Sequence, residues 1–239
     1  MIEVGVIKNI FRYPVKSMAG EALESCSLGW HGLEGDRRFS FRRMEDSGGF
    51  PWLSAGRLPS LIRYQPLRSA ESSGEQLPTH VRTPEGKEFE LRGEELRAEI
   101  AQTHGKDVQL MQLNHGIFDE AAVSLISLST IQGLEVESGK PLDVRRFRPN
   151  LLIETYSQAQ FSEDQWVGRT ICFGVEGGAE IGITLRDLRC AMVNLDPDTA
   201  ESDPIVLKSV ARLNEVCAGV YATVTRTGVV SVGQKLFLK

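Results

Sequence analysis

The sequence contains no pair of cysteines close enough together to form a metal knuckle. Its four cysteines lie far apart and include no Cys-x-x-Cys pair: Cys26, Cys172, Cys190 and Cys217. Zinc knuckles and iron–sulfur clusters need clustered thiolates, so this spacing indicates neither. In a reducing compartment, scattered cysteines are mostly buried apolar side chains. Each one is therefore expected to be structural unless its sequence neighbours indicate otherwise.

The sequence also lacks a long apolar run and an excess of positive charge. No apolar stretch approaches the roughly 20 residues that span a bilayer, and the N-terminus lacks the pattern of a signal peptide. We therefore expect no membrane segment and a cytoplasmic location. The 27 Lys and Arg residues are outnumbered by 32 Asp and Glu residues, which gives a net charge of -5. Proteins that bind nucleic acid concentrate positive charge, so we expect no nucleic-acid partner.

Aromatic residues are few, at 7% of the chain, whereas glycine is frequent, with 23 residues. This composition predicts many turns between short strands. A chain of 239 residues can bury a sizeable core as one large domain or as two small ones. We expect two closely packed units, covering residues 1–115 and 116–239, because the strand pattern breaks between Asn114 and Ala122.

Short alternating or apolar runs predict a mainly β fold with a few short helices. Helices are expected over residues 94–102 and 205–214, and a third that starts with Ser129 and Gln132 as a capping box and ends at about Ser138. Many short strands with glycine turns are typical of a closed or nearly closed barrel. Residues 69–78 are expected to form an exposed loop. The expected strands cover residues 4–13, 21–28, 39–44, 61–67, 80–83, 87–91, 107–113, 123–127, 151–153, 170–174, 179–186, 189–195, 219–225 and 229–238.

A loop with two polar residues follows the first expected strand. Lys16 and Ser17 stand side by side in it, and the loop ends at Gly20. An ammonium group next to a hydroxyl group can hold an anion. The alternative is a solvated lysine in an ordinary surface loop.

Two consecutive arginines follow a glycine-rich turn that ends at Gly35. Arg37 and Arg38 lead into an expected strand, where successive side chains point to opposite faces. One of the two can face inward, where it needs an anionic partner. The alternative is that both lie on the surface.

One cysteine has neighbours that suggest a role beyond packing. Cys190 stands beside Arg189 and is followed by the turn sequence Asp196-Pro197-Asp198-Thr199. Aspartate and proline favour turns, so Cys190 is expected near the exit of a strand, at a rim where a thiol can meet a ligand.

Four short motifs now occur in a specific order: Tyr13-Pro14-Val15-Lys16-Ser17, Gly35-Asp36-Arg37, Phe147-Arg148-Pro149-Asn150, and Arg189-Cys190 with its following turn. Together they resemble the MOSC family, a molybdenum-cofactor sulfurase C-terminal-type domain preceded by its own N-terminal β-barrel domain. The resemblance covers nearly the whole chain, including the closing Leu236-Phe237-Leu238. It implies two closely packed β-barrel-like domains, the second a MOSC-type barrel.

Within that family the sequence is similar to the amidoxime-reducing components and their bacterial relatives. This resemblance implies a molybdenum held by the dithiolene of a pyranopterin, with Cys190 as the protein ligand. Asp119 corresponds to an acidic residue near the metal and is expected to relay protons. The residues that would hold the pterin and its phosphate are Lys16, Ser17, Arg37, Arg148 and Asn150, and Ser127 would add a hydrogen-bond donor.

The chain departs from the family pattern after the cysteine. Val193 and Asn194 stand where the family usually has a threonine-rich stretch, and Ala200 stands where it usually has glycine. The chain ends at Lys239 without the cysteine-clustered ferredoxin domain of some relatives, so electrons are expected from a separate protein of ferredoxin, flavin or cytochrome type.

The function that the resemblance implies is reduction of N-oxygenated small molecules, such as amidoximes or hydroxylamines, at a Cys-ligated molybdenum. A second hypothesis is a carrier that holds sulfur as a persulfide on Cys190, or that holds the molybdenum cofactor for delivery. A third is a structural barrel that binds no cofactor.

Overall fold

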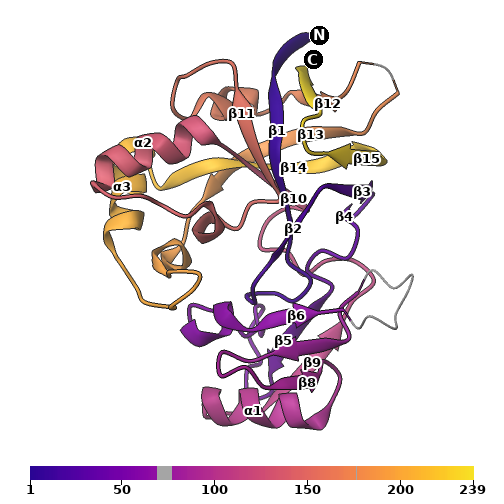
Figure 1. The fold of residues 1–239 in the computed structure, drawn as a ribbon, viewed down its shortest axis with the longest axis vertical. Coiled ribbons are helices and arrows are strands. Elements are labelled where there is room, and N and C mark those ends of the chain that lie inside the picture. Colours follow the sequence, from indigo (N-terminus) through magenta and orange to yellow (C-terminus); the bar gives the residue numbers. More distant parts are fainter. Residues whose placement is uncertain (69–76, 176) are drawn as a thin grey trace.

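The computed structural model describes residues 1–68, 77–175 and 177–239. Figure 1 shows two lobes, a larger one that contains both chain ends and a smaller one that contains the helix α1. Seven strands of the larger lobe close into a barrel, because the last of them pairs again with the first. In ring order they are β1 (Ile2–Arg12), β11 (Leu151–Thr155), β10 (Val123–Ser127), β14 (Cys217–Arg226), β13 (Glu180–Leu188), β12 (Thr170–Phe173) and β16 (Lys235–Leu238).

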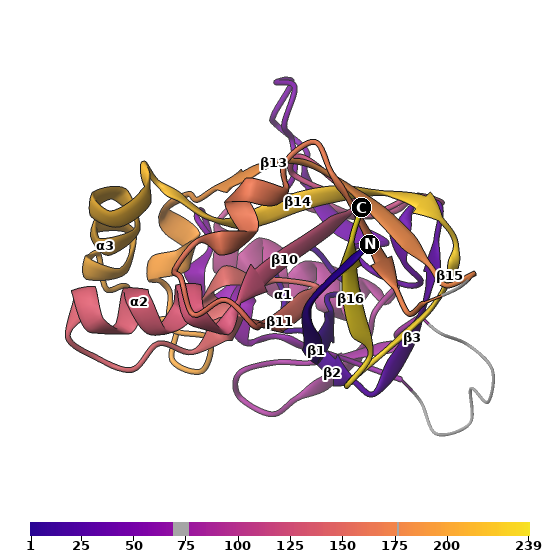
Figure 2. The same ribbon diagram turned by 90° about the horizontal axis from the view of Figure 1, so that it is seen from above.

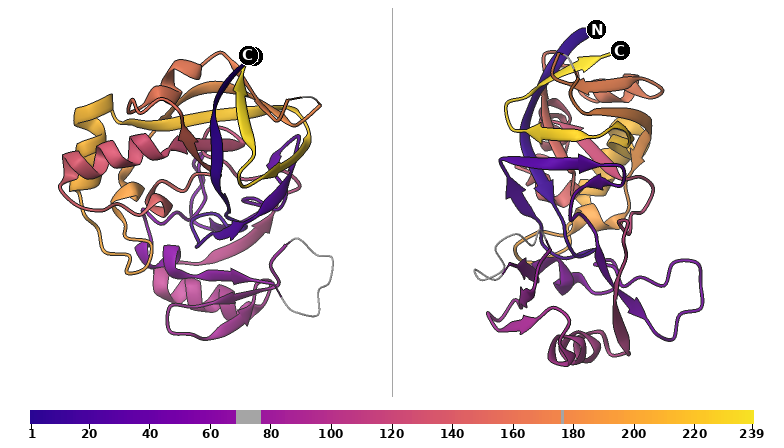
Figure 3. Two further views of the ribbon diagram at one scale, coloured as in Figure 1. Left: turned by 45° about the horizontal axis from the view of Figure 1, so that its top comes forward. Right: turned by 90° about the vertical axis from the view of Figure 1, so that its right-hand side faces the viewer.

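The barrel is mostly antiparallel, and only β10 and β11 pair in parallel. Side chains of alternate strand residues fill the interior of the barrel, and Ile181 and Ile183 of β13 are two of these buried residues. The two chain ends are adjacent, because Ile2 lies opposite Leu238 in the ladder between β1 and β16 (Figure 3).

Further elements surround the barrel. The strand β2 (Glu21–Leu23) pairs with β1, and a separate sheet contains β15 (Gly228–Ser231), β3 (Ser25–Gly29) and β4 (Gly32–Leu33). The helices α2 (Leu128–Ser138) and α3 (Ile205–Asn214) lie side by side at one flank of the barrel (Figure 2). Short 3-10 helices connect these elements: η2 (Val144–Phe147), η3 (Ser162–Trp166) and η4 (Ala191–Asn194).

The smaller lobe has its own core and its own small sheets. One sheet pairs β5 (Phe39–Arg43) with β9 (Val108–Gln112), and another contains β6 (Gln65–Leu67), β7 (His80–Arg82) and β8 (Glu88–Glu90). The remaining elements of this lobe are η1 (Pro59–Arg63) and α1 (Glu94–His104). Val15 and Met18 are fully buried in this core, although the barrel strand β1 ends only a few residues earlier, at Arg12. The chain therefore passes from one lobe into the other at Tyr13–Met18.

The prediction of a mainly β fold with a few short helices is confirmed, and the closed barrel is present. Three local predictions are wrong. Residues 61–63 belong to η1 rather than to a strand, and residues 191–194 form η4. The N-cap of α2 is Ser127 rather than Ser129, because Ser127 is the residue whose side chain accepts from the Thr130 amide.

Two further predictions are only partly covered by the structure. Within the expected loop of residues 69–78, residues 69–76 lie outside the described part of the chain. The domain boundary at 115 and 116 stays a prediction, while β1, on its N-terminal side, is a strand of the barrel. No helix in the described residues is long and apolar enough to cross a membrane.

Candidate functional site

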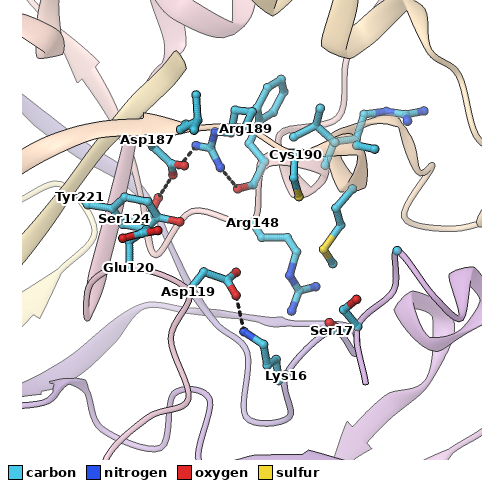
Figure 4. Close-up of a pocket in the computed structure, with 18 of the residues that line it drawn as sticks. Lys16, Ser17, Asp119, Glu120, Ser124, Arg148, Asp187, Arg189, Cys190 and Tyr221 are labelled. Atoms are coloured by element: carbon cyan, nitrogen blue, oxygen red, sulfur yellow. Dashed lines mark hydrogen bonds and ion pairs between the residues drawn. The ribbon is translucent and has the colours of Figure 1, made fainter. Parts of the chain in front are cut away.

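A cavity of about 640 Å³ is lined by residues of both lobes. Figure 4 shows many of its polar side chains, which come from the β1–β2 loop, β10 and the segment before it, the residue after η2, the end of β13 and β14. The charged and polar lining residues are Lys16, Ser17, Arg37, Ser54, Asp119, Glu120, Ser124, Arg146, Arg148, Asp187, Arg189, Cys190 and Tyr221. These positions are far apart in the sequence, so the fold creates the site.

Cys190 lies just beyond the end of the barrel strand β13. Its thiol is free and exposed, whereas the other three cysteines are buried. The chain turns directly after it into η4, for which Cys190 is the N-cap residue, and Val193 is buried beneath the helices α2 and α3. Burial of Val193 draws the segment toward the barrel and leaves the preceding thiol at the cavity wall. The predicted position of Cys190 at a strand exit is therefore what the structure shows.

Arg189 fixes the backbone next to this thiol. Its guanidinium group donates from Nε to the Ala218 carbonyl at 2.7 Å and from Nη1 to the Phe147 carbonyl at 2.7 Å. Its Nη2 lies 2.8 Å from Oδ2 of Asp187, and the group lies over the Phe147 ring, 5.5 Å from the centroid. These contacts join the end of β13 to β14 and η2, so Arg189 positions Cys190.

Lys16 and Asp119 form an ion pair at the cavity floor. The Lys16 ammonium donates to Oδ1 of Asp119 at 2.7 Å and to the Ile117 carbonyl at 3.3 Å. Desolvation lowers the pKa of Lys16 despite this partner. Desolvation would raise the pKa of Asp119, but the charge and hydrogen bond of Lys16 outweigh it and hold that pKa below its ordinary value.

Arg37 is the inward-facing member of its pair, and its anionic partner is the preceding residue. Its guanidinium group contacts Asp36, which is 1% exposed, and donates from Nη2 to the Arg148 carbonyl at 3.2 Å. Asp36 also accepts from the Tyr13 amide at 2.7 Å and from the Asn150 side chain at 3.1 Å. Desolvation would lower the pKa of Arg37, but Asp36 raises it, so the group stays charged.

Arg38 points elsewhere and donates to the Leu113 carbonyl at 2.8 Å. It does not line the cavity. The two arginines therefore face different ways as the sequence predicted, but strand alternation is not the cause, because Arg37 lies in the turn before β5 with a φ of 48°.

Arg148 has hydrogen-bonding capacity that the described chain does not use. Its Nη1 donates to the Met18 carbonyl at 2.7 Å, and the guanidinium group lies 4.1 Å from the centroid of the buried Tyr13 ring. Its Nη2 is buried and has no partner among the described residues. Burial lowers the pKa of Arg148 to about 10, which leaves it charged at neutral pH. An unpaired buried guanidinium N–H calls for an acceptor, which an anionic ligand in the cavity can supply.

Three residues of this floor have left-handed backbone conformations. Their φ angles are 66° at Ser17, 48° at Arg37 and 50° at Arg148. Residues other than glycine adopt this region at a cost of about 1–2 kcal/mol each, so the surrounding structure must hold them there. Such strain concentrates at functional sites, which supports a binding role for this floor.

An acidic wall faces the cavity from the barrel side. Asp187 is buried, accepts from the Ser124 hydroxyl at 3.0 Å, and is also hydrogen-bonded to Tyr221. Burial raises the pKa of Asp187 to about 6, although Arg189 opposes the rise. Glu120 lines the same wall and is exposed.

Most of the site residues that the sequence predicted come together here. The cavity is lined by Lys16, Ser17, Arg37, Asp119, Arg148 and Cys190. Asn150 lies beneath the lining, where it supports Asp36 and Arg37. Ser127 is not in the cavity, because its fully buried hydroxyl caps α2 and hydrogen-bonds to Glu163 at 2.8 Å.

Sequence reasoning missed the acidic wall. Ser124, Asp187 and Tyr221 lie in three different barrel strands, and no spacing within the sequence relates them. The nearest signal was Asp187 itself, a charged residue near the end of a strand and three residues before Cys190.

The three departures from the family pattern have structural roles. Val193 packs in the core, and the Asn194 side chain accepts from the Leu207 amide at 2.9 Å, which caps the first turn of α3. Ala200 has a φ of 64°, the region that glycine tolerates best, which explains the usual glycine there.

Two family models match the chain. The MOSC domain model matches residues 102–237, and the MOSC N-terminal beta barrel domain model matches residues 4–128. The chain belongs to the MOSC family. Membership associates the chain with the molybdenum cofactor, and the two matched ranges overlap in the segment that contains Asp119.

One solved structure supports the fold of this MOSC protein. The YUAD protein from Bacillus subtilis is similar with a TM-score of 0.52 and 14% sequence identity, over 98% of this chain and 95% of that one. YiiM from Geobacillus stearothermophilus is similar over 49% of this chain and 54% of that one, with 18% identity and a TM-score of 0.39. Comparison with curated protein sequences gives no match.

Proposed function

We propose that this MOSC protein is a molybdenum-cofactor-dependent reductase that removes oxygen from nitrogen in N-oxygenated small molecules. The observation that carries the proposal is one cavity that contains both an exposed free thiol, Cys190, and a cation with an unpartnered donor, Arg148. The two groups match the two ends of a molybdenum pyranopterin, a soft metal and an anionic phosphate.

The residues present fit this cofactor. Cys190 would supply the thiolate ligand, since a metal-bound thiol is deprotonated. Lys16, Ser17, Arg37 and Arg148 would surround the phosphate end, with Asp36 and Asn150 holding Arg37 in place. In the described residues, no group of three or more His, Cys, Asp and Glu side chains could hold a metal ion. When bound, the molybdenum cofactor supplies the two-electron redox chemistry.

The chain itself contributes binding, orientation and proton supply. Reductive removal of one oxygen from nitrogen takes two electrons and two protons and releases one water for each N–O bond that breaks. Asp119 is exposed in the cavity and ionised, so it can accept a hydrogen bond from a water molecule and orient that water to deliver a proton to the leaving oxygen. Lys16 holds this carboxylate in place. The electrons would come from a separate protein of ferredoxin, flavin or cytochrome type, in the cytoplasm.

The exposure of the Cys190 thiol also favours a second candidate, a carrier of the cofactor or of sulfur as a persulfide. A carrier would release its cargo to an acceptor protein and would not turn over an N-oxygenated substrate.

The test begins with the purified protein from a host that makes the cofactor. We expect molybdenum by elemental analysis and pterin fluorescence after oxidation. Dithionite-reduced protein should convert benzamidoxime to benzamidine. Cys190→Ala should abolish this reduction, whereas Cys26→Ala, which removes a buried thiol of the barrel core, should keep it.

The outcomes separate the candidates. Absence of both molybdenum and pterin would overturn the proposal. Molybdenum without reduction of any N-oxygenated compound would favour the carrier. Equal activity of wild type and Cys190→Ala would exclude Cys190 as the ligand.

A further inference from the structure

The charges that line the cavity can be matched pair by pair. Four cations have carboxylate partners in the described chain: Lys16 with Asp119, Arg37 with Asp36, Arg146 with Asp196, and Arg189 with Asp187. Two lining residues have no partner of opposite charge in this part of the chain, the cation Arg148 and the anion Glu120. The cavity therefore presents one uncompensated charge of each sign.

Arg148 already has a ligand under the proposed function, since a cofactor phosphate would accept from its free Nη2. Glu120 has none. Among the described residues its carboxylate makes no hydrogen bond and no ion pair, although Ser124 and Tyr221 line the same wall (Figure 4). Its neighbour Asp119, by contrast, is held by Lys16 at 2.7 Å. Glu120 is thus available to a ligand in a way that Asp119 and Asp187 are not.

Exposed apolar side chains also line the cavity. Phe50, Leu185 and Leu188 line it and are 45%, 37% and 67% exposed, which is unusual for large apolar side chains. Such residues around a cavity mouth mark a binding surface for an apolar group. A ligand that fills the cavity displaces water from its lining, which strengthens the attraction of the Glu120 carboxylate for a cation.

These observations identify a substrate class for the proposed reductase. Building on that proposed function, we propose that Glu120 selects substrates whose N-oxygenated group is cationic and is attached to an apolar body, such as aryl N-hydroxyguanidinium ions. The cation would contact the Glu120 carboxylate while the apolar body covers Phe50, Leu185 and Leu188. The resulting pair is a charge-assisted hydrogen bond at a partly exposed site.

The binding test uses two probes of nearly the same shape, the benzamidinium cation and neutral benzamide. Isothermal titration calorimetry of the cofactor-loaded protein should give about tenfold tighter binding of benzamidinium, as expected for one charge-assisted hydrogen bond. Glu120→Gln keeps the shape and removes the charge, so the ratio of the two affinities should fall to about one. Glu24→Gln is the matched control, because Glu24 is exposed, has no ion pair in the described chain and lies outside the cavity.

A ratio that is unchanged in Glu120→Gln would overturn the inference, as would benzamide binding more tightly than benzamidinium in the wild type. Binding of neither probe at millimolar concentration would also overturn it.

An activity arm separates this inference from the proposed function. The ratio of kcat/KM for an aryl N-hydroxyguanidine to that for the matched neutral aryl N-hydroxyurea should fall about tenfold in Glu120→Gln. Reduction of both compounds with equal ratios in wild type and variant would refute the role of Glu120 and leave the reductase in place. Reduction of neither compound, nor of benzamidoxime, would refute the reductase itself.

Discussion

The ammonium group of Lys16 lies 2.7 Å from the Asp119 carboxylate, although 103 residues separate the two in the chain. Lys16 follows the barrel strand β1 and enters the core region of the smaller lobe, whereas Asp119 precedes the barrel strand β10. The pair joins two of the segments that connect the lobes, and it lies at the floor of the cavity. Its integrity should therefore affect both stability and the site.

Removal of one partner should cost more than removal of both. Asp119→Asn leaves the buried Lys16 ammonium without its counter-ion and should lower the free energy of unfolding by about 1–2 kcal/mol, a value reduced because Asp119 is accessible to water. The double variant Lys16→Met with Asp119→Asn should recover part of this loss. Urea denaturation of the single and double variants measures the coupling.

The pH dependence of this pair has a defined sign. The folded-state pKa of Asp119 is lowered, so its contribution to stability is present above its unfolded-state pKa and is lost as the pH falls through the folded value. The destabilisation by Asp119→Asn should therefore shrink toward acid pH. A destabilisation that grows toward acid pH would contradict this account.

Arg189 should be among the most sensitive residues of the barrel. Arg189→Ala leaves the carbonyls of Phe147 and Ala218 without their donors and leaves the buried Asp187 without its counter-ion. We expect a loss of about 3–5 kcal/mol in the free energy of unfolding, measured by urea denaturation.

The control is Arg212→Ala. Arg212 is 64% exposed and forms a surface ion pair with Glu137, so its loss should cost less than about 1 kcal/mol. Similar costs for the two variants would show that Arg189 does not anchor the Cys190 segment.

The sequence predicted most of the cationic floor because its residues stand in short motifs at strand ends. The expected alternation allowed one of Arg37 and Arg38 to face inward with an anionic partner; Arg37 does so from the turn before β5, and its partner is the adjacent Asp36. The prediction of Cys190 at the exit of a strand rested on the turn that follows it, and β13 does end at Leu188.

The errors have equally local causes. Two serines, Ser127 and Ser129, stand at the start of α2, and the capping-box spacing selected the second one. The N-cap is Ser127, which donates hydrogen bonds to the buried Glu163 from its amide and its hydroxyl. Glu163 lies 36 residues away in the chain, so no local sequence pattern can reveal this contact. The acidic wall was missed for the same reason, since barrel closure brings Ser124, Asp187 and Tyr221 together from separate strands.

Asp187 should make the free energy of unfolding depend on pH, because its pKa differs between the folded and the unfolded protein. Its pKa is raised to about 6 by burial, so the stability that it contributes is fully present below its unfolded-state pKa and is lost as the pH rises through about 6. Asp187→Asn removes this loss. The free energy of unfolding of the variant, relative to wild type, should therefore rise by about 2–3 kcal/mol between pH 4 and pH 7.

Urea denaturation of Asp187→Asn and wild type at several pH values measures this change. Any effect of the asparagine side chain on stability that does not depend on pH cancels when the values at pH 4 and pH 7 are compared. Ser124→Ala removes a hydrogen bond to the Asp187 carboxylate and should shift the transition to higher pH. A difference between Asp187→Asn and wild type that is independent of pH would contradict the raised pKa of Asp187.

Arg148 should determine whether the cofactor stays bound. Arg148→Lys keeps the positive charge, but a single ammonium cannot both donate to the Met18 carbonyl and present a second planar donor to an anion. We expect retention of pterin and molybdenum after dialysis to fall at least about tenfold, which corresponds to the loss of one charge-assisted hydrogen bond. Pterin fluorescence after oxidation and elemental analysis give the two readings independently.

Arg38→Lys is the matched control, because Arg38 donates to the Leu113 carbonyl and does not line the cavity. It should retain the cofactor as the wild type does. Circular dichroism and thermal unfolding must show that both variants fold, since the φ of 50° at Arg148 is strained for lysine as well. If folded Arg148→Lys protein retained as much pterin as Arg38→Lys, the unpartnered Nη2 would not be a phosphate ligand, and Lys16, Ser17 and Arg37 would have to hold that group alone.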